Sequence, residues 1–402
     1  ELDAQRRGLL TEVEQLKAER KSASKQIGAL IGQKKKEEAE EKKAATKAIG
    51  DQITTLDQQV QETMKEQESI LLSLPNLPHE SIPDGASEED NPEIRQWGHK
   101  PEYGFDPQSH VDLCDQLSLI DFARGAKLAG SGFLLYTGWG ARLERALIQF
   151  LLDLHTREHG YTEVSPPFVV SPDCMTGVGQ FPKFYDQAYA VQEGEDGETL
   201  GKLYLVPTAE APVANIHREE LLKEEQLPIF YCAYSPCFRA EAGAAGVGTR
   251  GMIRVHQFDK VEMIKIVPAD QGYVELDAMV GNAEKVLQLL DLHYRVILLC
   301  TGDMGFASAK TFDIEVWAPG QGSYLEVSSC SNCEDYQSRR MNLRYKTREG
   351  KNVFPHLLNG SGTALARLFV ALIEAPQQED GSIRIPEPLK PYLGVEVIPA
   401  AP

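Results

Sequence analysis

The sequence predicts an α+β protein in which an antiparallel sheet with helices around it follows a long helical hairpin. Two observations predict this fold class. Residues 1–74 show heptad-like apolar spacing and contain no proline. The rest of the 402-residue chain alternates strand-like and helix-like stretches without a repeated parallel β-α-β unit. We therefore expect an arm (1–75), a linker (76–98) and a mixed domain (99–402).

The arm prediction rests on two stripes of apolar residues or their substitutes at intervals of three and four. A polar stretch, "GQKKKEEAEEKK", separates the stripes. Two antiparallel helices turning within residues 32–43 would bury each stripe against the other, over roughly 45–55 Å at ~1.5 Å per residue. The stripes are Leu9, Val13, Leu16, Arg20, Ala23, Ile27 and Leu30, and Ile49, Ile53, Leu56, Val60, Thr63, Gln67, Ile70 and Leu74.

The net charge of −19 argues against nonspecific binding of nucleic acid by the whole surface. The outer half of the hairpin is nevertheless basic, which favours contact with a phosphate backbone, although a solvated helix face is the alternative. The basic residues are Lys17, Arg20, Lys21, Lys25, Lys34, Lys35 and Lys36.

The segment "PNLPHESIPDGASEEDNP" (75–92) follows the arm. Its prolines and acidic residues end the helix and predict a linker. Beyond it, residues 140–160 predict an amphipathic helix that ends at Gly160. Residues 323–346 predict a strand, and "SGTALARLFVALIEA" (361–375) predicts a helix with a small and apolar side.

The sequence indicates neither a membrane-spanning segment nor a disulfide framework. No stretch approaches the ~18 consecutive apolar residues of a membrane helix. The odd number of cysteines, seven, suits a reducing cytoplasm. A zinc site would need the C-x-x-C at Cys330 and Cys333 together with Cys232 and Cys237, whose spacing is unusual, so buried free thiols are favoured. The chain begins at Glu1 inside a helical pattern, which suggests a truncated N-terminus.

Gly246, Gly248 and Gly251 spell G-x-G-x-x-G, the fingerprint of a dinucleotide site. That fingerprint requires a helix after the glycines, and a strand-like stretch follows here instead. The glycines are therefore expected in a loop that joins two antiparallel strands.

The strands on either side of this loop carry polar residues at alternate positions. "IFYCAYSPCFRAE" ends with Arg239 and Glu241, and "GTRGMIRVHQFDKVEM" places Arg254, Phe258 and Glu262 on one face. Over ~27 Å, at about 3.4 Å per residue, such a face suits a ligand that is anionic at one end, flat in the middle and cationic at the other. ATP with an amino acid fits this description, whereas an exposed face with surface ion pairs is the alternative.

Several long motifs go beyond such patterns. "FRAEAGAAGVGTRGMIRVHQFDKVEM", "ARLERALIQFLLDLHTREHGYTEVSPPFVV" and "LLNGSGTALARLFVALIE" resemble the three signature motifs of class II aminoacyl-tRNA synthetases. "VPTAEAP", "LEVSSCSNCEDYQSRR" and the helical hairpin with "LPNLPHESIPDG" resemble the seryl-tRNA synthetase family. The resemblance covers essentially the whole chain.

The resemblance implies a catalytic centre of Arg239, Glu326 and Arg367. It implies a serine site of Thr208, Ala209, Glu210, Arg239, Glu262 and Ser361. It implies an ATP site of Arg239, Ala240, Glu241, Arg254, Val255, Phe258, Glu326, Val327, Ser328, Ser329 and Arg367. Glu326 and Ser329 would hold Mg²⁺. The loop between the strands departs from the family, where it is often richer in charge, since Arg250 is its only charged residue, and this leaves open its contact with the tRNA acceptor end.

The resemblance further implies a cytoplasmic homodimer that charges tRNA(Ser), and also the selenocysteine tRNA, with L-serine. The basic hairpin would grip the long variable arm of the tRNA. Two alternatives are a relative that loads amino acids onto a carrier protein without tRNA, and a non-catalytic coiled-coil adaptor. The long arm argues against the first, and the intact Arg239, Glu326 and Arg367 argue against the second.

Overall fold

The computed structural model describes residues 1–191, 203–241 and 251–400. The chain divides into two compact units, residues 1–74 and residues 75–402. The loop glycines at 246 and 248 and Arg250 lie outside the described residues.

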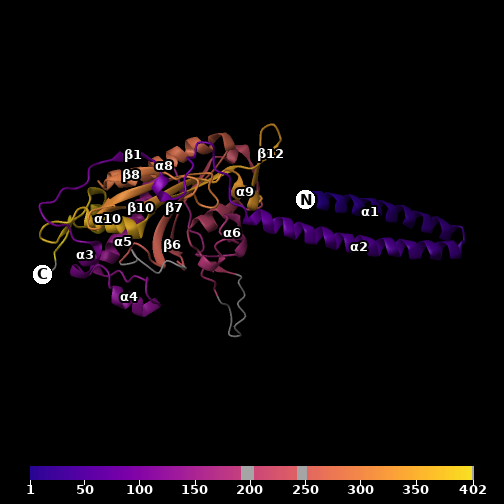
Figure 1. Cartoon of the computed structure of the whole chain (residues 1–402), viewed down its shortest axis with the longest axis horizontal. Helices are drawn as coiled ribbons and strands as arrows, with labels where there is room; N and C mark the ends of the chain where they lie inside the picture. The colour runs from indigo at the N-terminus through magenta and orange to yellow at the C-terminus, as the bar shows by residue number, and fades with distance from the viewer. Residues whose placement is uncertain (192–202, 242–250, 401–402) are drawn as a thin grey trace. The chain divides into compact units, whose positions relative to one another are not determined.

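The first unit is a hairpin of two helices, α1 (Leu2–Gly32) and α2 (Lys36–Ser73), which lie side by side (Figure 1). The turn between them is shorter than predicted, because most of the polar stretch forms the first turns of α2. Val13, Ile53, Val60 and Thr63, all from the two predicted stripes, are buried between the helices. Three stripe positions differ from the prediction, since Arg20, in the middle of the first stripe, and Ile70 and Leu74, at the end of the second, are exposed.

The predicted linker differs from the prediction at its end. Residues 93–97 form strand β1 (Glu93–Trp97), which pairs with β8 (Tyr294–Leu298) at one edge of the main sheet. Earlier in the segment, the side-chain amide of Asn76 donates to the carbonyls of Ala307 and Cys333, each at 2.9 Å. The segment therefore belongs to the second unit and is held there by backbone and side-chain hydrogen bonds.

The second unit is built on an eight-stranded sheet with the order β1-β8-β9-β10-β13-β7-β6-β2. Its neighbouring strands pair antiparallel, except the edge pair β2–β6, which is parallel. The antiparallel fold class predicted from the sequence is confirmed. The remaining strands of this sheet are β2 (Thr162–Glu163), β6 (Ile229–Phe238), β7 (Gln257–Val267), β9 (Lys310–Ala318), β10 (Ser323–Asn332) and β13 (His356–Ala364).

Within the described residues, short strands form three small sheets besides the main one. They are β3 (Val169–Val170) with β4 (Tyr204–Leu205), β5 (Leu221–Lys223) with β11 (Arg344–Lys346) and β12 (Asn352–Val353), and β14 (Ile383–Arg384) with β15 (Val397–Ile398). The helices of the unit are α3 (His110–Gln116), α4 (Phe122–Ala129), α5 (Gly138–Arg157), α6 (Pro172–Gly177), α7 (Glu210–Ala214), α8 (Gly272–Leu289), α9 (Tyr336–Arg340), α10 (Leu365–Glu374) and α11 (Lys390–Leu393).

The central strands bury both faces, each in its own core. Along β7, Val261 and Met263 join the larger cluster, to which α5, α8 and α10 contribute. Ile264 and Ile266 join a second cluster together with residues of α6 and α7. Because side chains alternate across a strand, Lys260 and Glu262 lie on the same side of the sheet as the second cluster. The polar side chains on this face of β7 therefore lie directly next to the apolar residues of the second cluster.

Three local predictions need correction. Strand β7 begins at Gln257, so Arg254 lies in a turn before the strand and the ~27 Å spacing along one strand does not apply. Residues 323–346 form β10, α9 and β11 rather than one strand. Residues 361–364 belong to β13, so Ser361 lies on a strand and only Arg367 lies on α10.

Candidate active site

The centre of the site is a buried ion pair on β7. Lys260 Nζ lies 2.5 Å from Glu262 Oε2, and the Glu262 side chain is only 1% exposed. Thr208, in the turn before α7, donates its hydroxyl to the same Glu262 oxygen at 2.5 Å. The ammonium of Lys260 also donates to Thr208 Oγ1 at 3.1 Å. On the neighbouring strand, Ser361 pairs in register with Glu262. The carboxylate of Glu262 is therefore in contact with the Thr208 hydroxyl and lies next to Ser361 in the sheet.

A second carboxylate, Glu210, lies beside this centre at the start of α7. Its Oε1 accepts hydrogen bonds from Gln337 Nε2 at 2.7 Å and from Asn359 Nδ2 at 3.0 Å. Burial, and secondarily the charge of Glu262, raises the pKa of Glu210 to about 7. The two amides orient one oxygen of this carboxyl group, so the group is positioned by residues on α9 and β13.

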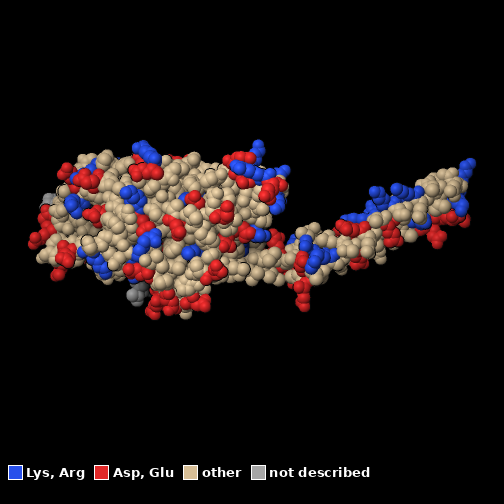
Figure 2. Space-filling model, turned by 90° about the horizontal axis from the view of Figure 1, so that it is seen from above, with Lys and Arg blue, Asp and Glu red and all other residues tan. Residues whose placement is uncertain are grey.

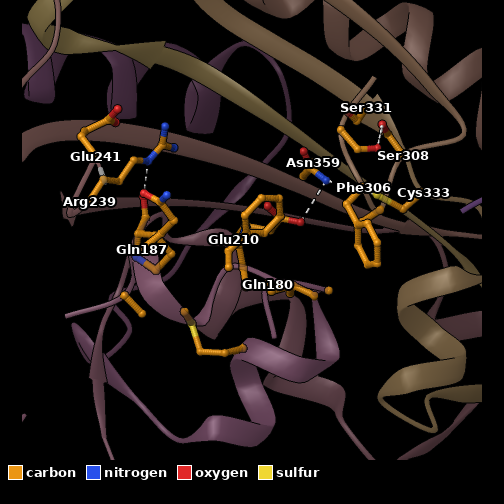
Figure 3. A pocket seen from close by; sticks show the side chains of 18 residues that line it. Gln180, Gln187, Glu210, Arg239, Glu241, Phe306, Ser308, Ser331, Cys333 and Asn359 are labelled. Carbon is orange, nitrogen blue, oxygen red and sulfur yellow. Dashed lines mark hydrogen bonds between the residues drawn. The ribbon is translucent and has the colours of Figure 1, made fainter. Parts of the chain in front are cut away.

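Two cavities meet at Arg239, the residue directly after β6. One, of about 430 Å³, has Arg239 and Glu241 at one end, Glu210 and Asn359 in the middle, and Ser308 at the other end (Figure 3). The other, of about 270 Å³, contains Arg254, Phe258, Lys260, Glu326, Ser361 and Arg367 besides Arg239 and Glu241.

The guanidinium of Arg239 is held by its surroundings. Its Nε donates to the carbonyl of Pro207 at 3.3 Å, and its central carbon lies 5.1 Å from the centre of the Phe258 ring. This position places a forked cation at the junction of the two cavities, where an anionic group common to both would be bound.

In the smaller cavity, Arg367 forms an ion pair with Glu326 at 2.9 Å and also donates to the Glu326 carbonyl at 3.0 Å. Strand β10 contains a register shift between Glu326 and Ser328. In a regular strand Glu326 and Ser329 would point to opposite faces, and one extra residue between them brings both to the same face. The shift therefore permits the Mg²⁺ pair that the sequence resemblance implies.

Some residues of the expected ATP and serine sites contribute no side chain to either cavity. Val327 is fully buried in the larger core. The hydroxyl of Ser328 donates to the carbonyl of Ser361 at 2.6 Å. Ala209 is fully buried, and the Ala240 N–H donates to the carbonyl of Gln187. Val255 lines the smaller cavity although it is largely buried.

Sequence reasoning assigned no role to several polar residues that the structure brings to the site. Lys260 lies on the polar face that the alternation predicts for β7, but the sequence does not indicate which residue its ammonium group contacts. Asn359 and Gln337 are separated from Glu210 by more than a hundred residues, so no local pattern could connect them. Asp313 pairs in register with Ser329, and its Oδ1 is a buried atom without a hydrogen-bond partner. Burial, followed by the charge of Glu326, raises the pKa of Asp313 well above its usual range.

The seven basic residues predicted on the arm are all exposed. Four of them, Lys17, Arg20, Lys21 and Lys25, line one shallow hollow on α1. Lys17 pairs with Asp57 at 3.2 Å, and Lys35 pairs with Glu38 at 3.0 Å. In Figure 2, basic side chains gather along one edge of the arm toward its turn, with acidic side chains along the other edge.

Cys232, Cys237, Cys330 and Cys333 are free and buried, as the favoured interpretation expects. Burial raises the pKa of the Cys330 thiol to about 12. Among the described residues, no helix is long and apolar enough to cross a membrane.

An antiparallel sheet with arginines and carboxylates converging on two joined cavities is the arrangement of a class II aminoacyl-tRNA synthetase core. Residues 189–376 match the family model described as tRNA synthetase class II core domain (G, H, P, S and T). Residues 1–78 match the model of the seryl-tRNA synthetase N-terminal domain. Together with the relatives described next, these matches show that the chain belongs to the seryl-tRNA synthetase family.

The relatives are similar over almost their whole length. The serine–tRNA ligase of Akkermansia muciniphila is 54% identical over 98% of this chain and 91% of the relative. That of Carboxydothermus hydrogenoformans is 50% identical over 99% and 92%. The crystal structure of seryl-tRNA synthetase from Pyrococcus horikoshii complexed with ATP is 38% identical, with a TM-score of 0.90 over 100% of this chain and 92% of that one.

Proposed function

We propose that this chain is a serine–tRNA ligase, which activates L-serine with ATP to seryl-adenylate and pyrophosphate and then transfers the seryl group to the 3′ end of tRNA(Ser). The observation that carries this proposal is the buried set of Glu262, Thr208 and Lys260 directly beside a cavity that contains Arg239, Phe258 and Arg367. The set offers partners for a small hydroxylated amino acid, and the cavity offers cations for phosphates.

Serine would lie with its ammonium group toward Glu262 and Glu210. Its hydroxyl would hydrogen-bond Ser361 and Thr208. Such a pocket rejects alanine, because the hydrogen-bonding groups would be left buried and unpaired. Arg239 would bind the serine carboxylate and the α-phosphate together, since it borders both cavities.

ATP would occupy the smaller cavity. Phe258 would stack on adenine, Glu241 and the backbone of Ala240 and Val255 would border the base, and Arg254 and Arg367 would contact the outer phosphates. The serine carboxylate attacks the α-phosphorus and pyrophosphate leaves, so the protein has to stabilise developing charge and needs no nucleophile of its own. Preplaced arginines supply that stabilisation.

Mg²⁺ would be held by Glu326 and Ser329. The donor set suits the ion, because Mg²⁺ prefers oxygen ligands and often uses one or two carboxylates with substrate phosphates. The unpaired buried oxygen of Asp313, opposite Ser329, adds an oxygen that lacks another partner. When bound, the ion would neutralise charge on the phosphate oxygens.

The hairpin would bind the long variable arm of tRNA(Ser) through phosphate contacts from the hollow on α1, with Lys34, Lys35 and Lys36 near the turn. We also propose a homodimer, for which the exposed Phe168 and Val169 at the end of the first signature motif offer apolar contact surface. The free thiols suit the cytoplasm. The domain limits proposed are 1–75 for the arm and 99–402 for the catalytic domain, which also takes β1 (Glu93–Trp97) from the end of the 76–98 segment. Charging of selenocysteine tRNA belongs to the same proposal.

The deciding experiment is ATP–pyrophosphate exchange with serine, threonine, alanine and cysteine supplied separately. Serine should support exchange at least about a hundredfold better than alanine. Well-folded protein that shows no serine-dependent exchange would refute the proposal.

Two further experiments test the hairpin and the dimer. Charging of tRNA(Ser), compared with charging of the same tRNA without its variable arm, tests the role of the hairpin. Sedimentation at several protein concentrations tests the dimer.

A further inference from the structure

Lys260 lies at the centre of the proposed site. It lies on β7 midway between Phe258 and Glu262, on the same face of the strand. Its side chain is only 10% exposed, yet it borders the smaller cavity together with Arg239, Glu326 and Ser361. Its ammonium is thus close both to the proposed serine site and to the proposed ATP site.

The ammonium group of Lys260 contacts the same groups that are proposed to bind serine. It contacts Glu262 at 2.5 Å and Thr208 at 3.1 Å. A buried ammonium is costly unless an anion or hydrogen-bond acceptor compensates its charge. When the ammonium of a substrate arrives at Glu262, two cations share one carboxylate. The pair between Lys260 and Glu262 is then weakened, and Lys260 needs another anion.

The substrate itself provides that anion. The serine carboxylate would lie on the Arg239 side of the pocket, and the α-phosphate would lie in the cavity that Lys260 borders. The lysine side chain is flexible and carries a compact charge, so a small rotation suffices to change partners. We propose that Lys260 is a further catalytic residue: it pairs with Glu262 in the empty site and moves to the serine carboxylate and the α-phosphate when the substrates bind.

This exchange of ion-pair partners rests on the proposed function and adds a selection step to it. A ligand with an ammonium and a hydroxyl but no carboxylate displaces Lys260 from Glu262 without offering it a new anion. Binding of such a ligand leaves Lys260 as an unpaired buried cation, which is electrostatically unfavourable. Lys260 therefore selects for the α-carboxylate, whereas Glu262 selects for the ammonium.

The test compares L-serine with L-serinamide, which keeps the ammonium and hydroxyl but lacks the carboxylate. For full-length wild-type protein, K260M and K260R, the KM and kcat for serine are measured by pyrophosphate exchange, and the inhibition constant of serinamide in the same assay. K260M should lower kcat/KM for serine by about a hundredfold or more, on the scale of losing one preorganised charge partner. It should bind serinamide as tightly as the wild type or more tightly. K260R, which keeps the charge, should recover part of the preference for serine.

The controls separate this inference from other causes. K346M replaces an exposed strand lysine on β11 and should leave all constants unchanged. If K260M weakens serine and serinamide by the same factor, Lys260 only positions Glu262 and the inference is wrong. A change of less than threefold for serine overturns it as well. If K260M does not fold, K260Q is measured in its place, and a ratio of the two ligands' constants unchanged from the wild type overturns the inference. Absence of serine-dependent exchange in the wild type would instead contradict the proposed function.

Discussion

Replacing Arg239 with alanine should remove the cation that lies where the two cavities meet. In the present structure the guanidinium donates one hydrogen bond to the Pro207 carbonyl and lies over the Phe258 ring. Loss of these contacts should lower the free energy of unfolding by about 2 kcal/mol, from ~1 kcal/mol for the hydrogen bond and up to ~1 kcal/mol for the cation–π contact. The variant should therefore remain folded.

The effect of Arg239→Ala on the reaction should be much larger than its effect on stability. A preorganised donor aimed at developing charge contributes about a hundredfold to a thousandfold in rate, or ~3–4 kcal/mol. We expect serine-dependent pyrophosphate exchange to fall by about a hundredfold or more. R239K keeps the charge but loses the fork, so its rate should lie between those of the wild type and R239A.

The control for this experiment is R384A, which removes an exposed arginine from β14 and should leave exchange unchanged. Thermal denaturation of each variant establishes that the protein is folded at the assay temperature. A decrease of less than threefold in a folded R239A protein would refute the reasoning, because the junction of the cavities would then not be the place where charge develops.

Three further outcomes are expected. Deletion of residues 10–65 should leave pyrophosphate exchange intact and abolish charging of tRNA(Ser); equal loss of both activities would contradict this division of labour. Exchanging Lys21 and Lys25 for glutamate should weaken tRNA binding and reduce its salt dependence without changing exchange, since each lost phosphate contact lowers the salt slope; unaltered tRNA affinity would place the contact elsewhere. The pKa of Glu210 is raised to about 7, so this carboxyl group gains a proton as the pH falls below 7. The KM for serine should therefore rise about fivefold from pH 7 to pH 6, because the ionised fraction of Glu210 falls by that factor. E210Q should lack this pH dependence, and the same rise in E210Q would assign it to another group.

Local patterns in the sequence predicted the family and most of the larger elements. The heptad stripes predicted the hairpin, and burial of Val13, Ile53 and Val60 confirms the faces that they assign. The alternation after the glycine loop predicted a strand with Phe258 and Glu262 on one face, although it extended the strand too far toward Arg254. These predictions succeed because the period of a helix or strand decides which side chains share a face.

The tertiary structure alone decided how the site is completed. Glu210 is oriented by Gln337 and Asn359, which reach it only because α9 and β13 pack beside α7. The register shift at Val327 turns Ser329 to the face of Glu326, which strict alternation would not allow. Lys260 meets Thr208 across 52 positions of sequence. Such contacts depend on register and packing between distant segments, and a periodic pattern holds information only about neighbours within its own element.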